Sequence, residues 1–81
     1  MTIDLAAVRA DTPNCENLLH FNNAGASLVP QPVYDSVIDH LDLEQLIGAY
    51  EAEDAASATL EDFYDAIAQM LCCHRDEIAY V

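Results

Sequence analysis

The clearest pattern of apolar positions lies near the end of the chain and predicts an amphipathic helix. Six residues recur at the three- and four-residue spacing of one helix face: Leu60, Phe63, Tyr64, Ile67, Ala68 and Leu71. Glu61, Asp62 and Asp65 fall on the other side. We expect this apolar stripe to face a core. Ser57 or Thr59, in the alanine-rich, acidic stretch before the stripe, is the candidate N-cap.

A second amphipathic helix is predicted to begin at Pro30–Pro32 and to end or bend at Gly48. Proline is tolerated in a first turn because its missing N–H has no helical partner there, and glycine commonly follows a helix end. Apolar residues repeat at helical spacing between these limits: Val33, Val37, Ile38, Leu41 and Leu46. Carboxylates cover the other side: Asp35, Asp39, Asp42 and Glu44.

Shorter segments complete the predicted fold. Thr2 is expected to cap a short helix over Ile3–Arg9, with Asp4 in its first turn. Leu18–Phe21 reads as a brief extended segment, His74–Glu77 as a turn, and Ile78–Val81 as the opening of a strand, which needs neighbouring strands. We therefore expect a mainly α fold with minor extended segments, in a single incomplete domain over residues 1–81.

Charge and composition exclude several classes of function. The 81 residues are 53% hydrophobic, which argues against disorder, and fifteen carboxylates against two arginines give a net charge of -13. Such a chain repels phosphate backbones and anionic lipids, so we expect neither a nucleic-acid nor a membrane partner. The acidic surface could attract a basic partner, but a solvated face is the simpler reading.

The N-terminal residues and the cysteines predict the cellular compartment. The opening residues carry no basic region before an apolar run, so they do not form a secretory signal, and no apolar run reaches the length of a membrane span. Three cysteines, two of them adjacent, do not make a disulfide framework. A reducing cytoplasm is therefore the expected location.

Two clusters contain residue types that can bind a metal or take part in catalysis. Cys72–His74 contains soft-metal ligands, but a structural zinc site needs four ligands in two spaced pairs, which His20 and His40 do not complete. The carboxylates of Glu51–Asp54 lack the spacing of a calcium loop. We therefore expect buried or half-buried cysteines at a helix end, a solvated acidic helix start, no metal and no catalytic residue.

The loop Asn22–Ser27, within HFNNAGASLV, is the best candidate for a binding site. Small side chains let a ligand approach the backbone, and Gly25 can adopt a positive φ. Successive backbone N–H groups in such a turn can form an anion-binding nest. A plain connecting turn is the alternative that composition alone favours.

The order of these motifs resembles a known family. LLHFNNAGASLVPQPVYDSVIDHL, then GAYEAE, then FYDAIAQMLCCHRDEIAYV is similar to the N-terminal segment of class V aminotransferases, which include cysteine desulfurases and related sulfur lyases that use pyridoxal phosphate (PLP). The resemblance covers Leu18 to Val81. It implies a fragment of the α/β PLP-dependent transferase (aspartate aminotransferase-like) fold, ending where the first strand of the large cofactor domain begins, and a family that is usually homodimeric.

The resemblance also implies a role for the loop. Asn23, Ala24 and Gly25 would line the active-site mouth, near the carboxylate of an amino-acid substrate. Gly25 stands where many relatives have alanine, and Asn22 where many have aspartate.

The absence of lysine limits what this chain can do alone. PLP enzymes hold their cofactor on a lysine, and the sequence has none, so we expect no cofactor on this chain alone and no catalysis by it. The leading hypothesis is a fragment whose backbone turn joins the substrate site of a larger enzyme. The alternatives are the small subunit of a split PLP enzyme, with the rest as a separate chain, and a free-standing acidic helical module that binds a partner.

Overall fold

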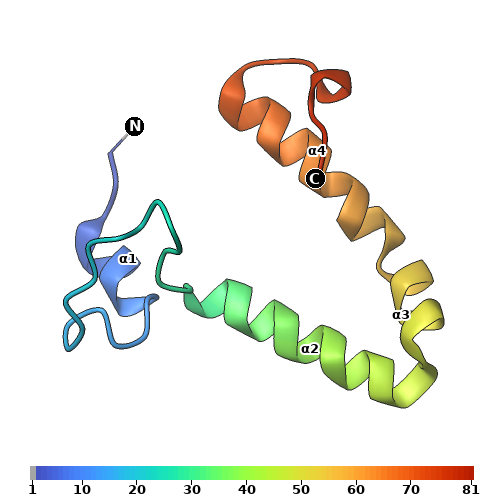
Figure 1. The fold of residues 1–81 in the computed structure, drawn as a ribbon, viewed down its shortest axis with the longest axis horizontal. Coiled ribbons are helices and arrows are strands. Elements are labelled where there is room, and N and C mark those ends of the chain that lie inside the picture. Colours follow the sequence, from blue (N-terminus) through green and yellow to red (C-terminus); the bar gives the residue numbers. More distant parts are fainter. Residues whose placement is uncertain (1) are drawn as a thin grey trace. The chain divides into compact units, whose positions relative to one another are not determined.

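The computed structural model describes residues 2–81, which are mainly helical (Figure 1). The elements are α1 (Leu5–Ala10), α2 (Gln31–Ile47), α3 (Ala49–Ala55), α4 (Ser57–Leu71) and the 3-10 turn η1 (Arg75–Glu77). The described part contains no strand, and none of its helices is long and apolar enough to cross a membrane. The mainly α prediction is confirmed.

The two segments predicted to be extended form no strand in this structure. Ile78 has extended dihedral angles, φ -103° and ψ 132°, but neither Leu18–Phe21 nor Ile78–Val81 pairs with another segment of residues 2–81. A strand exists through hydrogen bonds to a neighbour, so extended backbone without one remains an irregular segment.

The chain divides into two compact units, one ending at Asp42 and the other beginning at Leu43, within α2. In the first unit, the predicted cap of α1 was wrong. Asp4, not Thr2, is the N-cap: its side chain accepts the N–H of Ala7 at 3.1 Å, and the helix begins at Leu5. Asp4 has the extended backbone that a capping side chain requires.

The turns that follow α1 are held by side-chain contacts. Arg9 Nε donates to Glu16 Oε1 at 2.6 Å, and Cys15 Sγ donates to the carbonyl of Arg9 at 3.2 Å. The backbone N–H of Gln31 donates to the carbonyl of Asp11 at 2.6 Å. The first residue of α2 is therefore tied to the end of α1.

Both predicted limits of α2 are confirmed. The carbonyl of Pro30 accepts the N–H groups of Val33 and Tyr34, each at 3.1 Å, so the proline stands at the start of the first turn. The helix ends at Ile47, and Gly48 follows with a φ of 96°, in the region that glycine adopts without strain. The carbonyl of Gly48 then accepts the N–H of Ala52 at 2.9 Å and opens α3.

The second unit contains α3, α4 and η1. Neither Ser57 nor Thr59 caps α4, because both lie inside the helix and the N-cap is Ala56, with no side-chain cap. Ala56 has φ -90° and ψ 2°, a near-helical conformation in which the chain passes from α3 to α4 within one residue. No extended residue is left there to serve as a cap.

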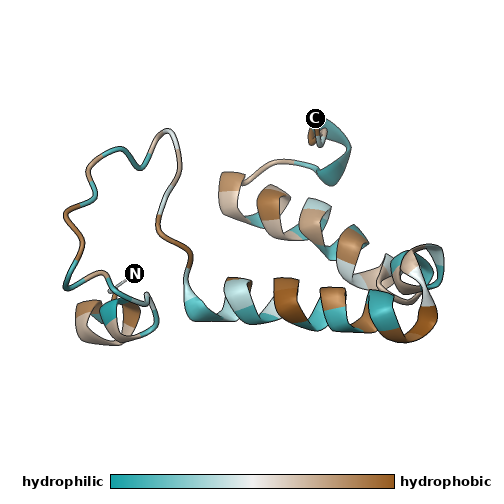
Figure 2. Ribbon diagram, turned by 60° about the horizontal axis from the view of Figure 1, so that its bottom comes forward, coloured by the Kyte–Doolittle hydropathy of each residue, from teal (hydrophilic) through white to brown (hydrophobic). Residues whose placement is uncertain are grey.

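The apolar stripes are largely uncovered in the described part of the chain. Ala52 and Ala68 are its only buried apolar residues, whereas Leu60 is 55% exposed and Phe63 39% exposed. Apolar residues recur along both α2 and α4 (Figure 2). The expectation that the α4 stripe faces a core is therefore met at Ala68 and not at Leu60, since little of residues 2–81 covers it.

Candidate functional site

The loop predicted as a binding site folds as a hydrogen-bonded turn. The N–H of Gly25 donates to the carbonyl and to Oδ1 of Asn22, both at 3.2 Å, and the N–H of Ala26 donates to the same carbonyl at 3.2 Å. His20 Nε2 donates to the carbonyl of Ala26 and joins the two ends of the loop. The segment is thus a β-turn over Asn22–Gly25, widened by one residue.

Gly25 does not adopt the positive φ that the sequence suggested. Among residues 2–81, positive φ occurs at Asn14, Gly48 and Cys72. Position 25 instead leaves little space for a side chain. A Cβ placed there would lie 2.8 Å from Asn22 Nδ2, closer than real Cβ contacts come.

The hydrogen bonds show which N–H groups the turn can offer. Those of Gly25 and Ala26 are used by Asn22, whereas those of Asn23 and Ala24 have no partner within residues 2 to 81. The whole turn is exposed. Two adjacent, unused N–H groups are the donor chemistry that binds a carboxylate or phosphate. The free donors of the turn are therefore the N–H groups of Asn23 and Ala24. The absence of a side chain at Gly25 leaves room for the side chain of Asn22.

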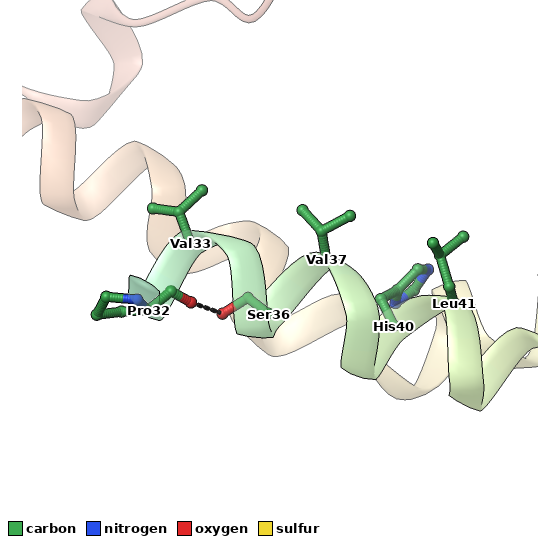
Figure 3. Close-up of a pocket in the computed structure, with 6 residues that line it drawn as sticks. All are labelled: Pro32, Val33, Ser36, Val37, His40 and Leu41. Carbon is green, nitrogen blue, oxygen red and sulfur yellow. Dashed lines mark hydrogen bonds between the residues drawn. The ribbon is translucent and has the colours of Figure 1, made fainter. Parts of the chain in front are cut away.

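A shallow hollow with a volume of about 520 Å³ lies along one apolar side of α2 (Figure 3). Its lining residues all come from this helix: Pro32, Val33, Ser36, Val37, His40 and Leu41. Ser36 Oγ donates to the carbonyl of Pro32 at 2.9 Å, so its hydroxyl is used within the helix. The surface offers apolar contact, and nothing in its geometry resembles an enclosed pocket with convergent polar groups.

An ion-pair cluster that sequence reasoning missed lies in the second unit. Arg75 Nη2 donates to Glu61 Oε2 at 2.7 Å, its Nε lies 3.2 Å from Asp65 Oδ1, and its guanidinium carbon lies 5.6 Å from the centre of the Tyr64 ring. The hydrogen bond to Glu61, with the charge of Asp65, raises the pKa of Arg75. The sequence signal for this cluster was the scarcity of positive charge, because Arg75 is one of only two arginine or lysine residues in the chain.

The other cation is engaged in the same way. The hydrogen bond that Arg9 donates to Glu16 lowers the pKa of Glu16 and raises the pKa of Arg9. Both arginines of the chain thus serve intrachain ion pairs.

The adjacent cysteines lie at the C-terminal end of α4. The N–H of Cys73 donates to the carbonyl of Ala68 at 3.0 Å, and that of Cys72 to Gln69 at 3.4 Å, with Cys72 in the left-handed conformation. This is a Schellman motif. Cys72 is exposed and Cys73 half-buried. No group of three metal-ligating side chains is assembled in the described part of the chain.

Comparison with known proteins gave one similar protein. A "Probable cysteine desulfurase" of Halobacterium salinarum is 34% identical over 76 residues, an alignment that covers 82% of this chain. This similarity supports a cysteine desulfurase-like relationship. The chain spans 18% of the length of that relative. No family model and no solved structure matches the chain.

Proposed function

We propose that this chain is the N-terminal segment of a class V aminotransferase-like PLP enzyme of the cysteine desulfurase type. The observation that carries the proposal is the 34% identity to the probable cysteine desulfurase, of whose length the chain spans 18%. The order of motifs from Leu18 to Val81 agrees with this similarity.

The residues present do not fit covalent attachment of PLP. The Schiff base of such enzymes needs a lysine, and none of the 81 residues is one. We therefore assign no chemical step to this chain. The lysine and the cofactor belong to the remainder of the enzyme, either in the same polypeptide or in a partner subunit.

Within that enzyme, the proposed task of this segment is to hold the carboxylate of the amino-acid substrate. The support is the pair of unused N–H groups at Asn23 and Ala24, next to a Gly25 whose own N–H is occupied. Backbone donors of this kind suit an anion because they are fixed by the turn and need no cationic side chain.

The exposed apolar faces of α2 and α4 support the existence of a larger body. Val37 is 54% exposed and Leu60 55% exposed, in stripes of a kind that normally lies against another surface. In the proposed enzyme, the remainder covers these stripes.

The first experiment is to isolate the native protein with an antibody against this sequence and to measure its intact mass and its co-purifying proteins. We expect either a polypeptide much heavier than 8.9 kDa or an 8.9 kDa chain bound to a lysine-bearing PLP protein. The second result identifies a split enzyme. An 8.9 kDa chain without a PLP partner, with a cooperative melt of its own, contradicts the proposal and favours a free-standing module.

The substrate role is tested in the isolated enzyme by Asn23→Pro. Residue 23 is the second residue of the β-turn, where proline is well tolerated, so this change removes one N–H and keeps the turn. We expect the KM for the amino acid to rise about tenfold or more, as for loss of a hydrogen bond to a charged group. Asn23→Ala keeps the N–H and should change KM little. Equal losses in both variants would place the donor in the Asn23 side chain instead.

A further inference from the structure

We infer that His74 is a proton-dependent N-cap of η1, whose imidazole exchanges one hydrogen-bond partner for another when it is protonated. Neutral imidazole has one ring nitrogen that accepts a hydrogen bond, and imidazolium has none. Histidine is the side chain whose charge ordinarily changes between about pH 5 and pH 8. The inference rests on the geometry of one turn and is independent of the proposed function.

In the neutral form, His74 takes part in a reciprocal cap. Its Nδ1 accepts the backbone N–H of Asp76 at 3.3 Å, and its own backbone N–H donates to Glu77 Oε2 at 2.8 Å. This is the arrangement of a capping box, with imidazole in the place usually held by a hydroxyl. Because Nδ1 accepts, its lone pair must be free and the ring proton must lie on Nε2.

A second partner for Nδ1 is already in place. Oδ2 of Asp76 lies 3.4 Å from Nδ1. Once Nδ1 carries a proton it can no longer accept the N–H of Asp76, but it can donate to this carboxylate. Protonation therefore moves the imidazole from the backbone donor of Asp76 to the side-chain acceptor of the same residue.

The rest of the turn keeps its contacts during this exchange. The charged groups around it are Asp76 and Glu77 in the turn and Glu61 and Asp65 on α4, and Arg75 is paired with the two on α4. Carboxylates ordinarily stay ionised above about pH 5. The Arg75 contacts thus hold η1 on α4 while the cap at Asp76 is lost.

The test is amide hydrogen exchange, followed by NMR on the full 81-residue chain at about pH 5 and about pH 8. Each rate is divided by that of an unstructured amide at the same pH to give a protection factor. We expect the protection of Asp76 to be about fivefold lower at the acidic pH, the change for one ordinary hydrogen bond. The N–H groups of Glu77 and Ile78 donate to the carbonyls of His74 and Arg75 and serve as internal controls, which should change less.

Two variants isolate the imidazole as the cause. His74→Asn keeps a capping acceptor that does not titrate, so the protection of Asp76 should be equal at both pH values. Asp62→Asn, which removes a carboxylate of α4 that pairs with neither Arg75 nor His74, should leave the pH dependence intact. The inference is overturned if wild-type Asp76 is equally protected, or unprotected, at both pH values, or if His74→Asn retains the pH dependence.

Discussion

At Gly25 the backbone passes so close to the Asn22 side chain that a Cβ would lie 2.8 Å from Nδ2 and 3.2 Å from Oδ1. Gly25→Ala should therefore push the Asn22 side chain away and break its hydrogen bond to the N–H of residue 25. Because Asn22 is exposed and can rotate, we expect the free energy of unfolding to fall by about 1 kcal/mol or less. The measurement is a thermal melt of the chain, with NMR contacts of the Asn22 amide.

A double-mutant cycle separates this contact from glycine's backbone effect. In an Asn22→Ala background no side chain stands in the way, so Gly25→Ala should cost less there than in the wild-type chain. Equal effects in the two backgrounds would show that backbone freedom, and not space, is what favours glycine at position 25.

Cys72 occupies a position that suits glycine. Its φ of 55° costs a residue with a Cβ roughly 1–2 kcal/mol. Cys72→Gly should therefore raise the free energy of unfolding by about 0.5–1 kcal/mol, since glycine also stabilises the unfolded chain by roughly 0.4–1 kcal/mol. Helix loss on heating, followed by circular dichroism, measures the change. Cys73→Gly, at a residue without positive φ, is the matched control and should destabilise; a gain there as large as that at Cys72 would refute the strain argument.

At the scale of elements, Arg75 joins η1 to α4 through Glu61, Asp65 and Tyr64. The Phe63 and Tyr80 rings, whose centres lie 5.7 Å apart, add an edge-to-face contact to the same junction. Arg75→Gln removes the charge, so we expect the NMR contacts between these rings to weaken while α4 stays helical.

Arg75→Lys should preserve this junction only in part, because an ammonium group lacks the forked guanidinium donors that reach two carboxylates. Arg9→Gln, which breaks the ion pair of the other unit, should leave the rings unchanged. If Arg75→Gln also leaves them unchanged, the aromatic contact alone holds η1.

The helices were predictable where a local signal marks them, and their caps were not. The apolar period found α4, while Pro30 and Gly48 marked the limits of α2. Ser57 and Asp4 show why caps failed, since a side chain caps only when its own backbone is extended, and composition does not reveal that. The small-residue loop was recognisable as a turn, but Asn22 as the acceptor of its N–H groups depends on geometry that sequence does not carry.

At the scale of the whole molecule, two features oppose each other. Large apolar side chains such as Val37 and Leu60 are about half exposed, which favours association. A net charge of -13 keeps copies of the chain apart and also strains each copy through its own repulsion. The few ion pairs offset little of this repulsion between carboxylates, because exposed pairs are weak and the chain has only two arginines.

Salt should therefore stabilise this chain. Raising NaCl from about 0.1 M to about 1 M shortens the screening length from roughly 10 Å to roughly 3 Å, which weakens both the repulsion and the ion pairs. Since thirteen charges are in excess, the loss of repulsion should dominate, and helix content and melting temperature should rise. Circular dichroism at low protein concentration measures both, and sedimentation checks that the gain is not self-association. Replacing Asp35, Asp39 and Asp42 by Asn should reduce the salt dependence; a melting temperature that falls with salt would mean that the ion pairs at Arg9 and Arg75 outweigh the net charge.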